Sequence, residues 1–264
     1  MNAPAPLDFH FDFISPYGYF ASLRIEELAA RHGRQVRWHP MLLGVSVMKV
    51  MGLKPLLDTP LKGPYTERDV LRYAREHRVP MQRHPADPVM QPLACARAMA
   101  WTAAHRPEQA AEVAHRIYRA CWGQGQDLST PASLVPVLGA ELAEAAAGDE
   151  AARLLRAEVD DALAAGVFGS PTVRVDGELF WGIDKFEQID RWLATGGFCM
   201  NDDMLRRHAP QTLRLANPIG ENDNGSGIVM GMGVGGDAIH MDEFFTTCPW
   251  IMPESLVKGI FVNE

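Results

Sequence analysis

Apolar and polar residues alternate at the start of the chain. Every second residue from Leu7 to Phe13 is apolar and the residues between them are polar. This period of two predicts a β-strand with one buried face. The strand pattern ends at Ser15-Pro16, and proline is favoured in the first turn of a helix. We therefore expect a helix from Tyr17 to His32, with Ser15 as its N-cap at the positive end of the helix dipole. Such an end can hold an anion, including a thiolate, although Ser15 could equally be a cap and nothing more.

A second strand is expected at Arg34 to His39, after a helix stop at His32-Gly33. A strand, a helix and a strand in this order predict a parallel pair with a right-handed crossover. From about residue 67 to 165 apolar residues recur at helical spacing, and the block is interpreted as a helical insertion. Within this insertion, Glu141 to Ala165 predicts one amphipathic helix or two shorter ones.

A β-hairpin is predicted near the end of this pattern. Thr172 to Val175 and Leu179 to Trp181 are β-rich, and Asp176-Gly177 between them is typical of a tight turn. Pro171 stands directly before the first of these strands and is a candidate for a cis peptide bond.

A last helix is expected to open at Asp184 and to run to Leu193. Asp184 and Glu187 have nearly the spacing of a capping box. Asp184 is interpreted as an ordinary N-cap or, alternatively, as a carboxylate that receives an ammonium group.

Three lysines punctuate the apolar segment that follows the second strand. Lys49, Lys54 and Lys62 are either solvated side chains or a cationic rim for a substrate that carries a carboxylate. The sequence favours the solvated interpretation for Lys54 and leaves Lys49 open.

Composition narrows the classes of function. The chain has 264 residues, 47% of them hydrophobic, and its net charge of −8 argues against nucleic acid as a partner. The four cysteines are scattered without a CxxC motif, which favours a reducing cytoplasm. We see no signal peptide, expect no membrane-spanning segment because no apolar run approaches about 18 residues, and expect no metal site.

The combined pattern resembles the DsbA-like thioredoxin fold of the disulfide oxidoreductases. Those proteins carry CxxC where this chain has Ser15-Pro16-Tyr17-Gly18, so dithiol–disulfide exchange is excluded at this position. Five motifs over residues 7–198 resemble the 2-hydroxychromene-2-carboxylate isomerases and, less closely, the kappa-class glutathione transferases: FDFISPYGY, HPMLLG, PLKGPY, GVFGSPT and FWGID. The fold class is therefore expected to be α/β, a thioredoxin-like fold with a helical insertion domain and a C-terminal tail.

The resemblance implies glutathione as cofactor. It places the Ser15 hydroxyl against the glutathione sulfur and the backbone of Ser170, before a cis Pro171, against the cysteinyl part. The γ-glutamyl end would be held by the backbone of Ile183 and the carboxylate of Asp184.

The resemblance also implies that Lys49 contacts the carboxylate of a small aromatic substrate. The family's following Gly-Asn pair is Gly52-Leu53 here, which removes a polar contact. A thiolate that adds to the C=C bond of the opened substrate leaves a single bond that can rotate, and elimination then restores the alkene. Apolar walls for the substrate could come from four aromatic residues, which could equally belong to the core: Phe13, Tyr17, Trp38 or Trp122.

The expected function is thus a glutathione-dependent isomerase of aromatic catabolism. The alternatives are a kappa-class-like glutathione transferase or a non-catalytic thioredoxin-like binding protein in which Ser15 is only a cap. A homodimer is compatible with the sequence.

Residues 199–264 differ in composition from the 1–198 domain. ATGGF, MLRRHAP and GMGVGGDAIHMDEFF, within residues 195–264, resemble an internal fragment of fumarate-reductase and 3-ketosteroid-dehydrogenase flavoproteins. The GxGxxG turn that would hold a flavin pyrophosphate is missing, so we expect a tail that binds no FAD.

Overall fold

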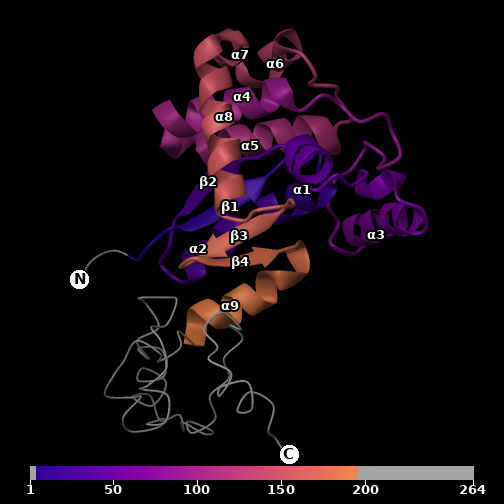
Figure 1. Cartoon of the computed structure of the whole chain (residues 1–264), viewed down its shortest axis with the longest axis vertical. Helices are drawn as coiled ribbons and strands as arrows, with labels where there is room; N and C mark the ends of the chain where they lie inside the picture. Colours follow the sequence, from indigo (N-terminus) through magenta and orange to yellow (C-terminus); the bar gives the residue numbers. More distant parts are fainter. Residues whose placement is uncertain (1–3, 196–264) are drawn as a thin grey trace, which may run out of the picture. The chain divides into compact units, whose positions relative to one another are not determined.

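The order of secondary-structure elements is the predicted one. The computed structural model describes residues 4–195 of the chain, and the expectations for residues 199–264 lie outside that part. The strands and α-helices are β1 (Leu7–Phe11), α1 (Pro16–Ser22), α2 (Ile25–Arg31), β2 (Val36–Pro40), α3 (Lys62–Glu76), α4 (Leu93–His105), α5 (Ala110–Tyr118), α6 (Pro131–Leu138), α7 (Ala140–Ala147), α8 (Asp149–Ala164), β3 (Thr172–Val175), β4 (Glu178–Trp181) and α9 (Phe186–Thr195) (Figure 1). Shorter turns of 3-10 or π type are η1 (Gly44–Val50), η2 (Leu56–Asp58), η3 (Pro107–Gln109), η4 (Arg119–Gly123) and η5 (Ile183–Lys185).

The four strands form one mixed sheet in the order β2-β1-β3-β4. β1 and β2 are parallel, with Phe11 opposite Pro40, as the β-α-β pattern predicts. β3 runs antiparallel to β1, with Thr172 opposite His10, and β4 completes the predicted hairpin. The carboxyl end of β1 consequently lies beside the start of β3.

Both faces of β1 are buried, although the sequence predicts only one buried face. Leu7, Phe9 and Phe11 are fully buried, as the alternation predicts, and Trp38 of β2 packs edge-on against Phe9. His10 points to the other face and is only 6% exposed. Helices α4 and α8 contact β2, and Glu158 of α8 bonds to His39 beside His10, so this cover explains why a polar position of the alternation is buried.

The predicted helix from Tyr17 to His32 is wrong in its length, since it is two helices. A turn at Leu23 and Arg24 separates α1 from α2, and Arg24 leaves helical geometry at φ −125° and ψ −20°. After this turn, Ile25 and Leu28 of α2 are buried in the core, whereas Leu23 in the turn is 46% exposed.

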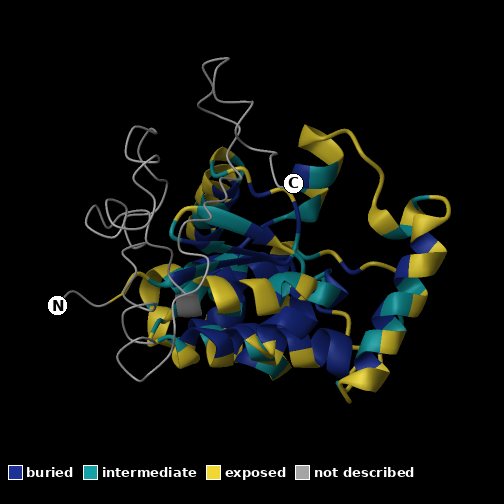
Figure 2. Ribbon diagram, turned by 90° about the horizontal axis from the view of Figure 1, so that it is seen from below, coloured by how far each residue is buried: buried dark blue, intermediate teal, exposed yellow. Residues whose placement is uncertain are grey.

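The predicted helical insertion is present, and its first helix, α3, begins at Lys62, before the expected start near residue 67. Glu141 to Ala165 forms two helices, which was one of the two alternatives, and Gly148 separates α7 from α8. Helices α4, α7 and α8 pack on one another beside the sheet (Figure 1). Buried residues run through the interior of the described part, and the outer helix faces are largely exposed (Figure 2). None of the helices described between residues 4 and 195 has both the length and the apolar character needed to cross a bilayer.

An ionic network joins the sheet to α8. The Nδ1 atom of His39 lies 2.8 Å from Oε2 of Glu158, and its Nε2 lies 3.4 Å from Oδ1 of Asp8. Burial alone would lower the pKa of His39, but these two carboxylates outweigh it and raise the pKa to about 9. Its neighbour His10 stacks on it at 4.9 Å, and burial lowers the pKa of His10 to about 4. The stacked pair therefore carries one positive charge near neutral pH.

Because His39 is charged in the folded protein, we predict that the free energy of unfolding falls as the pH rises toward 9. Because the folded pKa of about 9 exceeds the ordinary 6.5, the contribution is complete below pH 6.5 and is lost as the pH rises to 9. We expect His39→Gln to lower the free energy of unfolding at pH 6.5 by about 1–3 kcal/mol and to flatten its decline up to pH 9. Urea unfolding at several pH values measures this slope, and an unchanged slope in the variant would contradict the assignment.

Candidate functional site

Two motifs far apart in the chain meet at the end of β1. The Ser15 hydroxyl donates to the carbonyl oxygen of Ser170 at 3.0 Å, across 155 residues of sequence. The same hydroxyl oxygen accepts the Gly18 N–H at 3.0 Å, which confirms the predicted N-cap of α1. Ser15 is only 4% exposed, so this contact lies in the interior of the site.

The loop before β3 reaches toward η5. The Ser170–Pro171 peptide is cis, as predicted, and the Pro171 carbonyl oxygen accepts the Gly182 N–H at 2.9 Å. η5, which contains Ile183 and Asp184, contacts α1. The structure thus brings Ser15, Ser170, Pro171 and the Ile183–Lys185 turn to one end of the sheet.

The prediction that Asp184 caps the last helix is wrong. Helix α9 begins at Phe186, and Asp184 lies within η5, where no side chain caps the turn. The Asp184 carboxylate is largely exposed and lies 2.9 Å from the Lys185 ammonium. Gly182, at φ +105°, turns the chain sharply and starts η5 before the capping position is reached.

Lys49 lies on the π-helix η1. η1 begins after its N-cap residue Leu43, and the Met51 N–H donates to the Ser46 carbonyl oxygen five residues earlier. π-Helical turns are rare and often occur at functional sites. The Lys49 side chain is exposed, and no described contact joins it to Ser15.

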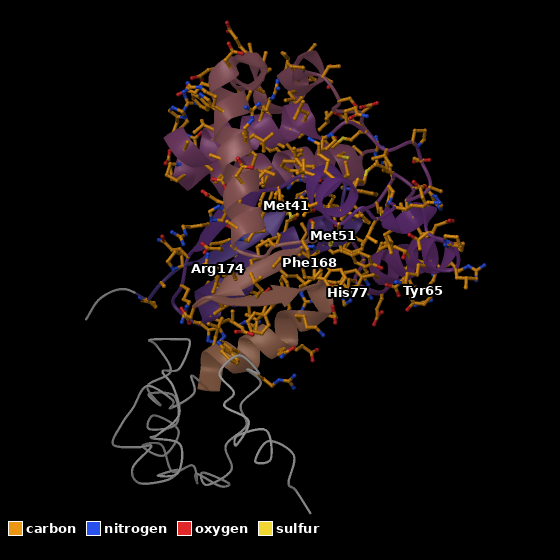
Figure 3. All side chains as sticks on the ribbon, in the orientation of Figure 1. Met41, Met51, Tyr65, His77, Phe168 and Arg174 are labelled. Atoms are coloured by element: carbon orange, nitrogen blue, oxygen red, sulfur yellow. The ribbon has the colours of Figure 1, made fainter. Side chains whose placement is uncertain are left out.

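Exposed apolar side chains continue beyond Lys49. Met51 is 38% exposed and Tyr65, at the start of α3, is 62% exposed (Figure 3).

Three of the four candidate aromatic walls belong to the core. Phe13, Trp38 and Trp122 are at most 4% exposed, and the Trp122 indole N–H donates to the Phe13 carbonyl oxygen at 2.8 Å. Tyr17 is half-buried, and its hydroxyl donates to Asp69 of α3 at 2.7 Å. The interpretation of Phe13, Trp38 and Trp122 as substrate walls is therefore wrong, because their rings fill the interior of the fold.

An exposed aromatic pair that the sequence analysis missed lies beside the cis-proline loop. Phe168 and Trp181 are 41% and 52% exposed, with ring centroids 4.9 Å apart. Phe168 is labelled in Figure 3. The Trp181 ring approaches Gly169 so closely that a Cβ there would clash with it. The sequence signal for this pair lies in the motifs GVFG and FWG, where aromatic residues stand beside glycines. Glycine has no side chain, so another group can approach its backbone closely.

The second missed residue is Asp12, which is 1% exposed. Burial raises the pKa of its carboxyl to about 6, although hydrogen bonds from the Leu43 and Ile14 N–H groups oppose the shift. Its place directly after the strand, at a polar position of the alternation, was the available signal.

Gly18 has no space for a side chain. A Cβ at this position would lie 2.6 Å from the Tyr118 hydroxyl oxygen and 3.0 Å from Oγ of Ser170. The Tyr118 hydroxyl itself donates to the Asp12 carbonyl oxygen at 3.1 Å. Tyr118 therefore occupies the space that a second cysteine of a CxxC motif would need.

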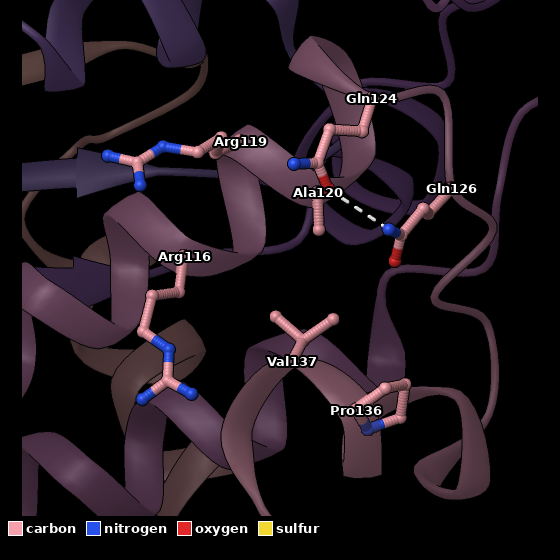
Figure 4. A pocket seen from close by; sticks show the side chains of 7 residues that line it. All are labelled: Arg116, Arg119, Ala120, Gln124, Gln126, Pro136 and Val137. Atoms are coloured by element: carbon pink, nitrogen blue, oxygen red, sulfur yellow. Dashed lines mark hydrogen bonds between the residues drawn. The ribbon is translucent and has the colours of Figure 1, made fainter.

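Two hollows lie away from these residues. One, of about 170 Å³, has Arg116, Arg119, Gln124 and Gln126 among its lining side chains (Figure 4). The other, of about 640 Å³, shares Arg116 and Arg119 and is also lined by Glu26, Glu108 and Glu112. Neither hollow includes a residue that the sequence predicted for the site. Among residues 4–195 there is also no group of three or more metal-ligating side chains suited to a metal ion.

Comparison with known proteins places this arrangement in a family. Residues 6–194 match the family model described as a DSBA-like thioredoxin domain. The chain therefore belongs to the DSBA-like thioredoxin domain family, which agrees with the thioredoxin-like fold expected from the sequence.

Among curated relatives, the chain is similar to 2-hydroxychromene-2-carboxylate isomerases. It is 27% identical to that of Pseudomonas sp. (strain C18) over 75% of this chain and 93% of the relative. It is also 27% identical to that of Sphingobium xenophagum over 71% of this chain and 97% of the relative.

A solved structure of 2-hydroxychromene-2-carboxylate isomerase aligns with a TM-score of 0.59. It is 23% identical, and the alignment covers 78% of this chain and 98% of that one. At this identity the likeness supports the fold.

The contact between Gly18 and Tyr118 makes a packing prediction. Alanine normally stabilises a helix relative to glycine by up to about 1 kcal/mol, but at Gly18 the new methyl group meets Tyr118 and Ser170. We expect Gly18→Ala to lower the free energy of unfolding by about 1–3 kcal/mol, as overpacking does, and Tyr118→Phe in addition to restore part of the loss. The control is Gly44→Ala, since a Cβ at Gly44 meets nothing within 4 Å. Thermal unfolding measures all three proteins, and equal effects of the two alanines would refute the steric argument.

Proposed function

We propose that this protein is a glutathione-dependent isomerase of 2-hydroxychromene-2-carboxylate-type substrates. The observation that carries the proposal is the hydrogen bond between Ser15 and Ser170, which joins the two motifs that resemble the glutathione site of such isomerases. The curated relatives of the same name support the reaction class. Two buried free thiols, Cys95 and Cys121, agree with a place in the reducing cytoplasm.

The residues at the end of β1 fit a thiol-bearing peptide better than a protein disulfide. Ser15 supplies a hydroxyl where a redox thiol would stand, and Gly18 leaves no room for a resolving thiol. Glutathione would be held by Ser15 at its sulfur, by the backbone of Ser170 before Pro171, and by Ile183 and Asp184 at its γ-glutamyl end. The exposed carboxylate of Asp184 suits the ammonium of the γ-glutamyl end, and the backbone of the loop before β3 suits an extended peptide.

When bound, glutathione supplies a thiolate that adds reversibly to the substrate double bond and so allows that bond to rotate. Ser15 favours the ionised sulfur by donating a hydrogen bond to it. Lys49, on the exposed surface of η1, pairs with the substrate carboxylate and fixes the orientation of the substrate. Ser15 acts as a hydrogen-bond donor and Lys49 as a positive charge, and neither forms a covalent bond.

The Ser15 hydroxyl has one hydrogen, and the Ser170 carbonyl oxygen receives it in this structure. To donate to a sulfur, Ser15 must turn away from that carbonyl. The Gly18 N–H can stay on the hydroxyl oxygen during the turn, because it uses a lone pair and not the hydrogen. Binding of a peptide backbone to Ser170 would offset the lost hydrogen bond.

The direct test is a spectrophotometric isomerisation assay on 2-hydroxychromene-2-carboxylate with and without glutathione. We expect turnover that needs glutathione without consuming it. Stoichiometric consumption of glutathione would instead favour a kappa-class-like transferase. An inactive protein whose melting temperature glutathione raises, with Asp184→Ala abolishing the rise, would be a binding protein.

For Ser15→Ala we expect kcat to fall by one to a few orders of magnitude, because one donor to the developing charge is lost, about 2–4 kcal/mol. Glutathione affinity should change less. The variant also loses the N-cap, so the matched control is Ser22→Ala in the same helix. The Ser22 hydroxyl is also buried, and it donates to the Tyr19 carbonyl oxygen at 2.7 Å. Steady-state kinetics on both variants separates the roles, and wild-type turnover in Ser15→Ala would rule out a catalytic Ser15.

For Lys49→Met we expect the apparent KM of the chromene carboxylate to rise about tenfold or more, with a smaller change in the KM of glutathione. The ammonium that pairs with the carboxylate is lost while the aliphatic stem is kept. Lys54→Met, at another exposed lysine of the same segment, is the control and should leave both constants unchanged. Equal rises in the two KM values for Lys49→Met would point to a folding defect.

A further inference from the structure

The Asp12 carboxylate joins two segments that the proposed function uses. Its Oδ1 accepts the Ile14 N–H at 3.1 Å, directly before Ser15. Its Oδ2 accepts the Leu43 N–H at 2.7 Å, at the N-cap of the π-helix that carries Lys49. One buried carboxylate therefore holds the start of both segments.

The backbone of Asp12 joins two more parts of the site. Its N–H donates to Oγ of Ser170 at 2.9 Å, and its carbonyl oxygen accepts the Tyr118 hydroxyl at 3.1 Å and the Ser15 N–H at 3.0 Å. The serine turn, the cis-proline loop, α5 and η1 all meet at this residue.

A carboxylate is better suited to this position than its neutral analogue. An isolated buried carboxylate is costly, and two backbone N–H groups repay only part of that cost. An asparagine of the same shape could accept one N–H but would turn its own N–H groups toward the other. The ionisable groups around Asp12 are Cys95, Cys121 and Tyr118, and burial raises the pKa of each above its ordinary value, so all three are neutral near pH 7. Asp12 thus supplies the one anionic acceptor of this group.

We propose that Asp12 is a positioning residue, whose carboxylate fixes the Ser15 turn and the Lys49 helix in one register. This proposal rests on the proposed function. The separation between the hydroxyl that supports the sulfur and the ammonium that holds the substrate would then depend on two hydrogen bonds to one side chain. Loss of either bond moves Ser15 or Lys49 relative to the other.

The first test compares Asp12→Asn with Asp8→Asn. Asp8 is a partly buried carboxylate on β1, the strand that directly precedes Asp12; it accepts a hydrogen bond from Arg37 at 2.7 Å and does not touch the site. We expect both variants to melt at lower temperature. Only Asp12→Asn should lower kcat and raise the KM of the chromene carboxylate, together about tenfold or more in kcat/KM, because a small misplacement of reacting groups is expensive. Equal kinetic effects of the two variants would overturn the positioning role.

A double-mutant cycle tests whether Asp12 affects catalysis through Lys49. If Asp12 acts through the helix that begins at Leu43, the combined loss in Asp12→Asn with Lys49→Met is smaller than the product of the single losses. Independent, multiplying losses would overturn the link to Lys49.

A measurement without turnover separates this proposal from the proposed function. Amide hydrogen exchange in the full chain should accelerate at Ile14, at Leu43 or at both in Asp12→Asn, since asparagine can keep at most one of the two bonds, and stay unchanged at both in Asp8→Asn. Inactive wild-type protein with this exchange pattern would overturn the proposed isomerase while supporting the double anchor. Unchanged exchange at both Ile14 and Leu43 in Asp12→Asn would overturn the anchor whatever the activity.

Discussion

The antiparallel pairing of β1 with β3 is the constraint on which the site depends. With His10 opposite Thr172, the carboxyl end of one strand lies beside the first residue of the other. Ser15 and Ser170 leave these two ends and meet at hydrogen-bond distance. The helical insertion lies between them in the chain and covers the sheet, so it can vary in length without moving the two ends apart. Site geometry is therefore set by strand register, and the helices hold that register by packing.

The parts of the fold that the sequence predicts are those with a local cause. The strand alternation from Leu7, the Ser15 cap and the Asp176-Gly177 turn each follow from residues within a few positions of one another. The cis bond before Pro171 and the division of residues 141–165 into two helices are consistent with the same kind of signal. Ser15 and Ser170 were named for the same site only through the family resemblance, since no local pattern joins residues 155 apart.

The features that the sequence did not predict come from contacts distant in the chain. His10 is buried because α8 supplies Glu158 to its neighbour His39, and the strand pattern contains no trace of that helix. Asp12 has the appearance of a polar, solvent-facing strand residue until Leu43 and Ser170 are seen to bond to it. From the sequence, Trp122 could be a substrate wall or a core residue. In the structure its indole N–H donates to the Phe13 carbonyl oxygen, which makes it a core residue. In each case the neighbouring sequence fits two interpretations equally well, and a hydrogen-bond partner far away in the chain decides between them.

The bonds of Ser15 also constrain the kind of chemistry it can perform. An activated serine nucleophile needs a base that accepts its proton, and the acceptor here is the Ser170 carbonyl oxygen, which cannot take up a proton at neutral pH. The Gly18 N–H occupies a lone pair of the hydroxyl oxygen and strengthens the O–H group as a donor. A hydroxyl that is polarised in this way, buried and without a basic acceptor suits a donor to a neighbouring anion. The bond from the Gly18 N–H, which makes Ser15 a helix cap, also makes it a better hydrogen-bond donor, so the structural and the functional interpretation of this residue do not compete.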